Sequence, residues 1–256
     1  MTRIGILGAN GRMGRSLIGL IAASDDLVLS GAGLRAGHSL VGQDAGEALG
    51  LGRTLGVPLQ DSAYAVAQHS DVVIDFTLPA ALEENLAAAE RTATPMVIGT
   101  TGLDDRCLAA LDATAMKLPI VFAANYSSGI TLLLRLAAIA AGALSADYDV
   151  AISEAHHRYK KDAPSGTALR LGEVVAKARD IEALDSSAFQ SIRAGDIVGE
   201  HTVLLAAEGE RIELTHRASS RDTFARGALR AAQWLLKQQT PGRYDMEDVL
   251  GLRGVG

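Results

Sequence analysis

The stretch "RIGILGANGRMGRSLIGLIAA" (residues 3–23) decides which fold the rest of the chain can adopt. It opens with an apolar run from Ile4 to Leu7, continues with Gly8, Gly11 and Gly14, and then repeats apolar residues at helical spacing. This order predicts a strand, a glycine turn and a helix. Glycines let the backbone approach a pyrophosphate, and amides at a helix N-terminus face it. The stretch therefore predicts a dinucleotide cradle.

The spacing of this turn departs from the usual G-x-G-x-x-G because Asn10 occupies the second glycine position. A tight turn in any α/β protein is the alternative interpretation. The following stretch "DLVLSGA" (residues 26–32) favours the dinucleotide site, because it supplies a second strand at the distance that such a site requires.

The end of that second strand predicts which dinucleotide binds. The segment "GAGLRAG" (residues 31–37) carries Arg35 and no acidic residue that would bind the ribose hydroxyls. An arginine at this place suits a 2′-phosphate, because it forms charge-assisted hydrogen bonds with it. We expect NADPH as the preferred cofactor and NADH as a possible one. A solvated loop arginine is the alternative interpretation.

Strands and helices continue to alternate along the first half of the chain. The stretches "SDVVIDFT" (residues 70–77), "PMVIGTTG" (residues 95–102) and "LPIVFAANYS" (residues 118–127) are typical of buried strands, the first ending at Thr77. They predict a Rossmann-like doubly wound parallel sheet, whose ligands lie beyond the carboxyl ends of the strands. The predicted cofactor edge comprises Thr77, Gly99, Thr100, Thr101, Ala123, Ala124, Asn125 and Tyr126.

The stretch "EAHHRYKKDAPSGTA" (residues 154–168) places two histidines at the end of another predicted strand. Strand alternation would point His156 and His157 to opposite faces, which favours different roles for them. His156 is suited to donate a proton near neutral pH. A zinc site is the alternative, but no Cys or His partners stand nearby at ligand spacing, so we expect no metal.

The same stretch also predicts a site for a compact dicarboxylate. Ser165 is a predicted N-cap, and Gly166 and Thr167 would then offer backbone amides at a helix N-terminus. Lys160 and His157 could supply positive charge to the same place. A basic solvent-exposed loop with a helix cap is the alternative interpretation.

The composition excludes several classes of protein. A formal net charge of −6 argues against a nucleic-acid binder, which needs a basic face. The single cysteine, Cys107, allows no intrachain disulfide and fits a reducing compartment. No stretch reaches the roughly 20 apolar residues of a membrane span. The first residues lead directly into a strand and show no signal peptide. We expect a soluble, cytoplasmic protein.

The rest of the chain predicts a second domain and a return to the first. Residues 192–219 alternate turns with short strands, which is typical of a mostly antiparallel or mixed sheet. Residues 223–239 form an amphipathic helix with Trp234 in its core face. We expect an α/β dinucleotide-binding domain at residues 1–126 and 217–256 and an α+β substrate-binding and oligomerisation domain at residues 127–216.

Together these motifs resemble those of the 4-hydroxy-tetrahydrodipicolinate reductase family, long called dihydrodipicolinate reductases. The resemblance spans nearly the whole chain in the same order, and it is most specific around His156 and Lys160. It is carried by "ILGANGRMGR", "VVIDFT", "MVIGTTG", "VFAANYS", "EAHHRYKKDAPSGTA", "RAGDIVGEHT", "LTHRASS" and "GRYDMEDVLGL".

The resemblance implies an enzyme of lysine and diaminopimelate biosynthesis. It would reduce a cyclic imine dicarboxylate to tetrahydrodipicolinate with NADPH or NADH, as a homotetramer joined through the sheets of its substrate domains. Position by position, it implies His156 as proton donor and acceptor and Lys160 as a second proton donor. It implies substrate binding by His157, Gly166 and Thr167. It implies cofactor binding by Gly8, Ala9, Asn10, Gly11, Arg12 and Met13, and by residues 99–101 and 123–126.

Two departures from the family pattern matter. The segment at residues 31–37 lacks the acid that often precedes the arginine, which favours NADPH over NADH. Residues 181–191 are shorter than in many members and lack their glycines and arginine, so the rim of the site is expected to differ. Two alternatives stay open: another two-domain NADP-dependent imino or amino acid reductase, and a catalytically silent NADP-binding regulator. The regulator would be expected to lose His156 or Lys160, and the chain has both.

Overall fold

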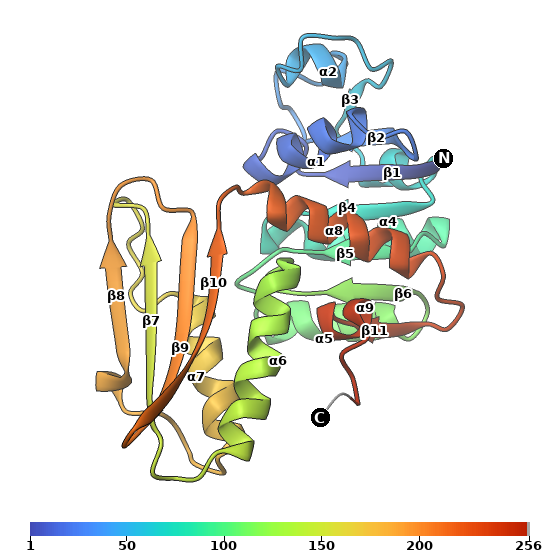
Figure 1. Cartoon of the computed structure of the whole chain (residues 1–256). Coiled ribbons are helices and arrows are strands. Elements are labelled where there is room, and N and C mark those ends of the chain that lie inside the picture. Colours follow the sequence, from blue (N-terminus) through green and yellow to red (C-terminus); the bar gives the residue numbers. More distant parts are fainter. Residues whose placement is uncertain (255–256) are drawn as a thin grey trace. The chain divides into compact units, whose positions relative to one another are not determined.

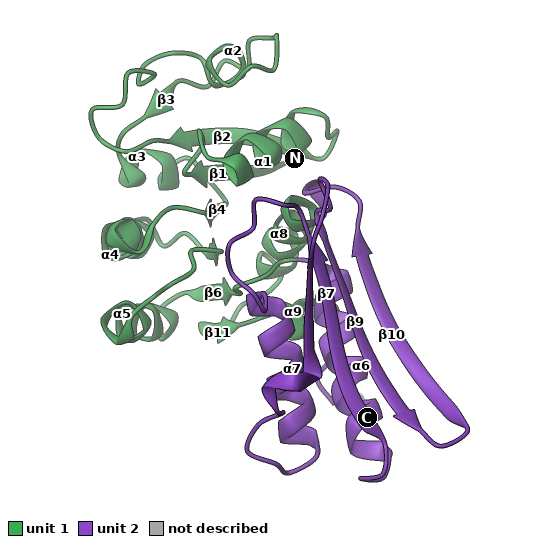
Figure 2. Ribbon diagram, turned by 90° about the vertical axis from the view of Figure 1, so that its left-hand side faces the viewer, with its two compact units in different colours: residues 1–126, 224–251 green, residues 127–223, 252–256 purple. Residues whose placement is uncertain are grey.

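The computed structural model describes residues 1–254 of the chain. Its backbone divides into two compact units (Figure 2). Unit 1 comprises Met1–Tyr126 and Phe224–Gly251, and unit 2 comprises Ser127–Thr223 and residues 252–254. No helix within residues 1–254 is long and apolar enough to cross a lipid bilayer.

Unit 1 contains the doubly wound parallel sheet that the sequence predicts (Figure 1). Within the described residues the sheet has seven strands in the order β11-β6-β5-β4-β1-β2-β3, and all neighbouring pairs are parallel. The direction of winding reverses between β1 and β4, and ligands bind at such a switch point. The strands are β1 (Thr2–Leu7), β2 (Leu27–Gly33), β3 (Leu59–Gln60), β4 (Val72–Asp75), β5 (Met96–Ile98), β6 (Pro119–Phe122) and β11 (Gly242–Tyr244).

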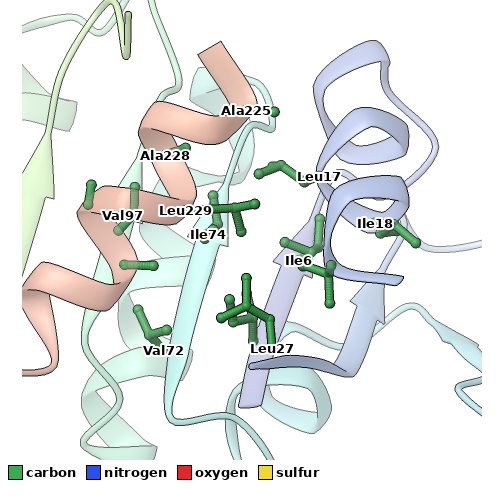
Figure 3. Packing of buried hydrophobic residues seen from close by; sticks show 14 of the residues in the cluster. Ile6, Leu17, Ile18, Leu27, Val72, Ile74, Val97, Ala225, Ala228 and Leu229 are labelled. Atoms are coloured by element: carbon green, nitrogen blue, oxygen red, sulfur yellow. The ribbon is translucent and has the colours of Figure 1, made fainter. Parts of the chain in front are cut away.

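Helices cover both faces of this sheet. Figure 3 shows Leu17 and Leu229, from helices on one face, beside Ile74 of β4. Ile74 belongs to that cluster and Val73 to the cluster on the opposite face, so successive strand residues are buried on both sides. The helices are α1 (Arg12–Ala22), α2 (Ala45–Ala48), α3 (Ala63–Ala67), η1 (Pro79–Ala81), α4 (Leu82–Thr92), α5 (Asp105–Ala115), α8 (Asp222–Leu235) and α9 (Met246–Leu250).

The glycine turn between β1 and α1 depends on the absence of side chains. Gly8 has a φ of 82°, which favours glycine. A Cβ at Gly14 would lie 2.3 Å from the carbonyl oxygen of Gly8, so a larger residue there would push α1 away from β1. These two glycines therefore hold the first turn of α1 close to the end of the strand.

Unit 2 combines a mixed sheet with helices on one of its faces (Figure 1). Within the described residues the strand order is β10-β9-β7-β8; β7 and β8 are parallel, and the other pairs are antiparallel. Ile152, Val203 and Leu205 of the sheet are buried in one core with Ala137 and Leu171 of the helices. The elements are α6 (Ser128–Ala143), β7 (Asp149–His156), α7 (Gly166–Ala178), η2 (Ser186–Ala188), β8 (Phe189–Arg193), β9 (Gly199–Ala207) and β10 (Glu210–Ala218).

Some predicted boundaries are wrong. The strand expected to end at Thr77 ends at Asp75, because the Asp75 carboxylate accepts a hydrogen bond from the Thr77 amide at 2.8 Å and the chain turns there. Within residues 181–191, for which the sequence predicts no element, Phe189 begins β8 and pairs with Ile152 of β7. That pairing joins segments far apart in the sequence, which a local pattern does not reveal.

Candidate functional site

A cavity of about 560 Å³ lies at the carboxyl ends of β1, β2 and β4 in unit 1. Gly8, Gly11, Arg35 and Thr77 line it, so the structure brings together four of the residues predicted to bind the cofactor. Phe76 supplies an apolar wall. A concave site at the switch point of a doubly wound sheet suits a dinucleotide.

The start of α1 is open toward a ligand. Gly11 is its N-cap and offers no side-chain oxygen, so the amides of Arg12 and Met13 have no side-chain cap. Ala9 is fully buried and Met13 packs partly against the core, so these residues would contact a phosphate mainly through their backbone. Uncapped amides at a helix N-terminus are suited to an anion.

Asn10 acts on the turn through its side chain. Its Nδ2 lies 3.2 Å from Nε2 of His38, and its Oδ1 accepts a hydrogen bond from Nη2 of Arg15 at 2.5 Å. Arg15 also donates to the carbonyl of Leu49 at 2.7 Å. Asn10 therefore fastens the glycine turn to the loop that follows β2, which a glycine in the same place would not do.

The ends of β4 and β5 are tied together by Asp75. This buried carboxylate accepts hydrogen bonds from the Thr77 amide, from Asn85 Nδ2 at 2.9 Å and from Thr100 Oγ1 at 3.5 Å. Burial raises the pKa of Asp75, although the hydrogen bonds from Thr77, Asn85 and Thr100 oppose that shift. Thr100 is therefore buried in this network, whereas Thr101 is exposed.

Two of the predicted cofactor residues have a packing role. The side chain of Tyr126 is buried, and its hydroxyl lies 2.9 Å from the carbonyl of Ile98 and 3.0 Å from that of Val121. Its ring packs edge-on against Phe76, with centroids 5.6 Å apart. A Cβ at Gly99 would lie 2.1 Å from the ring of Phe76. Ala123, Ala124 and Asn125 remain at the sheet edge and partly or fully exposed.

Acidic residues line the cavity that holds Arg35. Asp61 and Glu84 both belong to its lining. Asp61 directly follows Gln60 of β3, and Gln60 pairs with Gly33 at the end of β2. The pairing therefore places an acidic residue near the end of β2. Sequence reasoning looked for an acid on the second strand itself and missed this one, because a strand of two residues has no recognisable pattern.

In unit 2, His156 is held by a buried ion-pair network. Its Nδ1 lies 2.5 Å from Oε2 of Glu154. Arg193 donates from Nη1 to that oxygen at 2.8 Å and from Nη2 to Oε1 at 2.6 Å. The backbone amide of Ser165 donates to Oε1 at 3.2 Å. Sequence reasoning selected His156 but missed Glu154 and Arg193, because their contact depends on the pairing of β7 with β8.

The pKa values follow from these contacts. Burial alone would raise the pKa of Glu154, but hydrogen bonds from Arg193, Ser191 and His156 lower it to about 2. Burial lowers the pKa of His156; Glu154 opposes that shift, and the charges of Lys160 and Arg193 add to it. The site therefore holds a permanent carboxylate beside an imidazole that can change its charge.

His201 and Ser165 complete the buried side of the network. Ser165 is the N-cap of α7 and accepts a hydrogen bond from the Ala168 amide at 3.2 Å, as the sequence predicts. Its Oγ also lies 3.1 Å from Nε2 of His201. His201 was not selected from the sequence, because nothing in the local pattern of "GEHT" distinguishes it from other strand residues.

The exposed side of this network carries the remaining predicted residues. β7 ends at His156, so His157 lies in the following turn, where its carbonyl accepts a hydrogen bond from the Lys160 amide at 3.0 Å. Nδ1 of His157 is buried without a hydrogen-bond partner among residues 1–254. Lys160 Nζ pairs with Asp162 at 2.7 Å.

The first residues of α7 face open space. No heavy atom outside its chain neighbours and the helix's own backbone lies within 4 Å of a Cβ placed on Gly166, which is exposed. Thr167 is the next residue of α7 and is half-buried. Unit 2 therefore places a titratable imidazole, a lysine and an accessible helix N-terminus in one segment. Residues 1–254 contain no cluster of His, Cys, Asp or Glu side chains suited to a metal ion.

Comparison with known proteins gives consistent results along the whole chain. Residues 2–126 match the family described as "Dihydrodipicolinate reductase, N-terminus", and residues 129–250 match "Dihydrodipicolinate reductase, C-terminus". The chain is 54% identical to the 4-hydroxy-tetrahydrodipicolinate reductase of Alkalilimnicola ehrlichii, over 98% of this chain and 99% of that protein. It is 50% identical to the protein of the same name from Chromohalobacter salexigens, over 99% of this chain and 100% of that protein.

Solved structures show the same fold. A dipicolinate-bound dihydrodipicolinate reductase from Paenisporosarcina sp. TG-14 superposes with a TM-score of 0.77 at 24% identity, over 96% of this chain and 97% of that chain. An amine dehydrogenase from Mycobacterium smegmatis superposes with a TM-score of 0.65 at 15% identity, over 96% of this chain and 95% of that chain. At these identities the likeness concerns the fold alone.

Proposed function

The chain belongs to the dihydrodipicolinate reductase family, and from that premise we propose that it reduces 4-hydroxy-tetrahydrodipicolinate to tetrahydrodipicolinate in lysine and diaminopimelate biosynthesis. Replacing the 4-hydroxyl by hydrogen takes up one hydride and one proton and releases water. The observation that carries the proposal is the segment of unit 2 in which His156, Lys160 and the open start of α7 occur together.

The reduced nicotinamide of NADPH or NADH would supply the hydride. The glycine turn fits such a dinucleotide, because α1 begins without a side-chain cap and Gly14 lets it approach the end of β1. Gly8, Gly11 and Thr77 would surround the cofactor in the cavity. Unit 1 is thus the proposed dinucleotide-binding domain.

NADPH is the proposed preferred cofactor, and NADH a possible one. Arg35 lines the cavity and would pair with a 2′-phosphate. Asp61 in the same cavity favours the ribose hydroxyls of NADH and limits the preference. The relative affinity for NADPH and NADH would depend on both Arg35 and Asp61, so the binding experiment should vary both residues.

Unit 2 is the proposed substrate domain. The amides of Gly166 and Thr167 would bind one carboxylate of the substrate, with positive charge from Lys160 and His157. Lys160 would have to exchange Asp162 for the substrate. His156 would deliver the proton through Nε2, since Nδ1 faces Glu154. Lys160 is the proposed second proton donor.

The proposal includes a homotetramer joined through the sheets of unit 2. The sheet face opposite the helices carries small, polar and apolar residues that are only partly exposed, among them Ser153, Thr202 and Leu204. Thr202 Oγ1 and Thr215 Oγ1 lie 3.0 Å apart on that face, next to the ion pair of Glu200 and Arg217, so polar and paired charged groups lie beside Leu204. Light scattering coupled to gel filtration measures the assembly, and a monomer would contradict this part.

One assay tests the proposed reaction. NADPH oxidation is followed after adding freshly made substrate from the preceding aldolase, with and without the purified protein. Rapid oxidation that depends on both supports the proposal. Binding of NADPH without oxidation would indicate a silent NADP-binding regulator. Oxidation with another imino acid but not with this substrate would indicate a different reductase.

A further inference from the structure

We infer that Glu154 is a positioning residue, which fixes the nitrogen through which His156 exchanges protons and ties the His156 ring to the start of α7. The inference rests on the proposed function in one respect, namely that His156 supplies the proton. Glu154 itself lies behind the ring and is 2% exposed, so it acts through His156 rather than on the substrate.

The strand geometry places Glu154 and His156 together. They are separated by one residue in β7, so their side chains leave the same face of the strand. Arg193 pairs with His156 in the parallel ladder of β7 and β8, and from there its guanidinium reaches both oxygens of Glu154. Arg193 also donates to the carbonyl of Asp162 at 2.6 Å, which fixes the guanidinium in turn. The carboxylate is therefore held from two sides.

The ionised carboxylate determines the tautomer of His156. A carboxylate only accepts hydrogen bonds, so the His156 nitrogen that lies 2.5 Å from Glu154 must carry the hydrogen. Nδ1 is thus the fixed donor to Glu154, and Nε2 is the nitrogen that gains and loses a proton. A buried carboxylate orients a catalytic histidine in the same manner in serine proteases.

The surroundings of Nε2 agree with this assignment. Gly199 begins β9, and a Cβ at that position would lie 3.1 Å from Nε2 of His156. The glycine therefore keeps the approach to this nitrogen open. His201 packs edge-on beside the ring, with centroids 5.1 Å apart, and Lys160 approaches from the turn after β7. Among residues 1–254, the titratable and charged groups recorded against the His156 ring are these two together with Glu154 and Arg193.

The same carboxylate reaches the proposed anion site. Oε1 of Glu154 accepts the hydrogen bond of the Ser165 amide, and Ser165 is the N-cap that begins α7. The position of the Gly166 and Thr167 amides is therefore set relative to the ring by one group. A displacement of Glu154 would move the proton donor and the anion site together.

The competing interpretation is that Glu154 and Arg193 form a structural ion pair only. Removing one partner of a buried pair is destabilising in either case. The two interpretations differ in the protonation of His156, which a structural pair would leave unchanged. The experiments therefore measure protonation as well as rate.

The first experiment needs no substitution at Glu154. Nitrogen-15 NMR of histidine-labelled wild-type protein reports which ring nitrogen carries the hydrogen in neutral His156, with His156→Gln used to assign the signal. Hydrogen on Nδ1 is expected. Hydrogen on Nε2 in the neutral form would overturn the inference. This readout stays valid whatever the substrate is, so it is independent of the proposed reaction.

The second experiment uses Glu154→Gln, Glu154→Asp and the control Glu173→Gln, which removes the charge of an exposed carboxylate in the same unit paired with Arg170. Glu154→Gln is expected to lower kcat about ten- to a hundredfold, the range for a lost charge-assisted hydrogen bond. The decline of kcat on raising the pH should begin at lower pH, because the carboxylate no longer favours the protonated ring. NADPH affinity should stay unchanged.

The conservative variant separates positioning from charge. Glu154→Asp should restore the pH profile in part, because it keeps the negative charge at a shorter reach. A folded Glu154→Gln with a wild-type pH profile and kcat would overturn the inference. If His156→Gln retains full turnover while the NMR result holds, the proposed proton donor fails and the role of Glu154 in fixing the ring stands.

Discussion

The ring of His201 packs edge-on against the ring of His156, and Nε2 of His201 lies 3.1 Å from Oγ of Ser165. Burial, with the charge of His156 as a second cause, lowers the pKa of His201 to about 4. His201 is therefore neutral at neutral pH. A neutral neighbour supports the His156 ring without repelling its protonated form.

This relationship predicts a specific loss of stability in acid. The pKa of His201 is about 4 in the folded protein against 6.5 as the ordinary value. As the pH falls below about 6.5, the unfolded chain takes up the proton more readily, so stability decreases toward pH 4. His201→Gln should reduce this loss by up to about 2 kcal/mol between pH 6.5 and 4.5. Urea unfolding at both pH values measures it.

The matched control for this prediction is His69→Gln, since His69 is exposed. It should leave the pH dependence of unfolding as in the wild type. An equal pH dependence in His201→Gln and wild type would show that His201 is not the group that takes up the proton.

His156→Gln should retain NADPH binding and lose most turnover. General acid–base catalysis typically contributes about 10²–10⁴-fold, and glutamine supplies no titratable proton. Fluorescence titration with NADPH and steady-state kinetics measure the two properties separately. A well-folded variant with the wild-type kcat would exclude His156 as the proton donor.

Lys160→Met should weaken competitive inhibition by pyridine-2,6-dicarboxylate, a planar dianion that resembles the product. Loss of one charge-assisted contact corresponds to roughly a tenfold or larger rise in the inhibition constant. Lys161→Met is the control, because Lys161 is exposed and adjacent in sequence. Equal inhibition constants for the wild type and both variants would remove Lys160 from the carboxylate site.

Arg35→Ala should weaken NADPH binding about ten- to a hundredfold and leave NADH binding nearly unchanged, because only NADPH carries the 2′-phosphate. The wild-type preference for NADPH should decrease with added salt. Asp61→Asn should act in the opposite direction and increase the NADPH preference, since it removes a repelling charge from the same cavity. Dissociation constants for both cofactors decide the matter; equal losses for the two in Arg35→Ala would mean that Arg35 shapes the loop only.

The sequence predicts the parts of this fold that local patterns encode. The glycine turn, the apolar strands buried on both faces and the cap at Ser165 all appear where they are expected. Each depends on residues close together in the chain, such as Gly8 and Gly14 or Ser165 and Ala168.

The remaining parts depend on contacts between distant segments. Glu154 and Arg193 meet only because β7 and β8 pair in one register, and the two residues are far apart in the sequence. Tyr126 resembles a cofactor residue in its motif, although its side chain is buried against Phe76. Asp61 reaches the cavity through a strand of two residues. Pairing and burial of this kind follow from the complete fold.

The occupied carboxylate of Glu154 has a consequence for the catalytic cycle. Its oxygens contact His156, Arg193 and the Ser165 amide, so Glu154 is not expected to pass protons between Nδ1 of His156 and bulk water. In the proposed cycle, a proton that leaves His156 through Nε2 would therefore also return through Nε2. Proton donation to the substrate and proton uptake from solvent would use the same nitrogen, so the two steps would occur one after the other. The ring would then take up its next proton from solvent after the product leaves and before the next substrate binds.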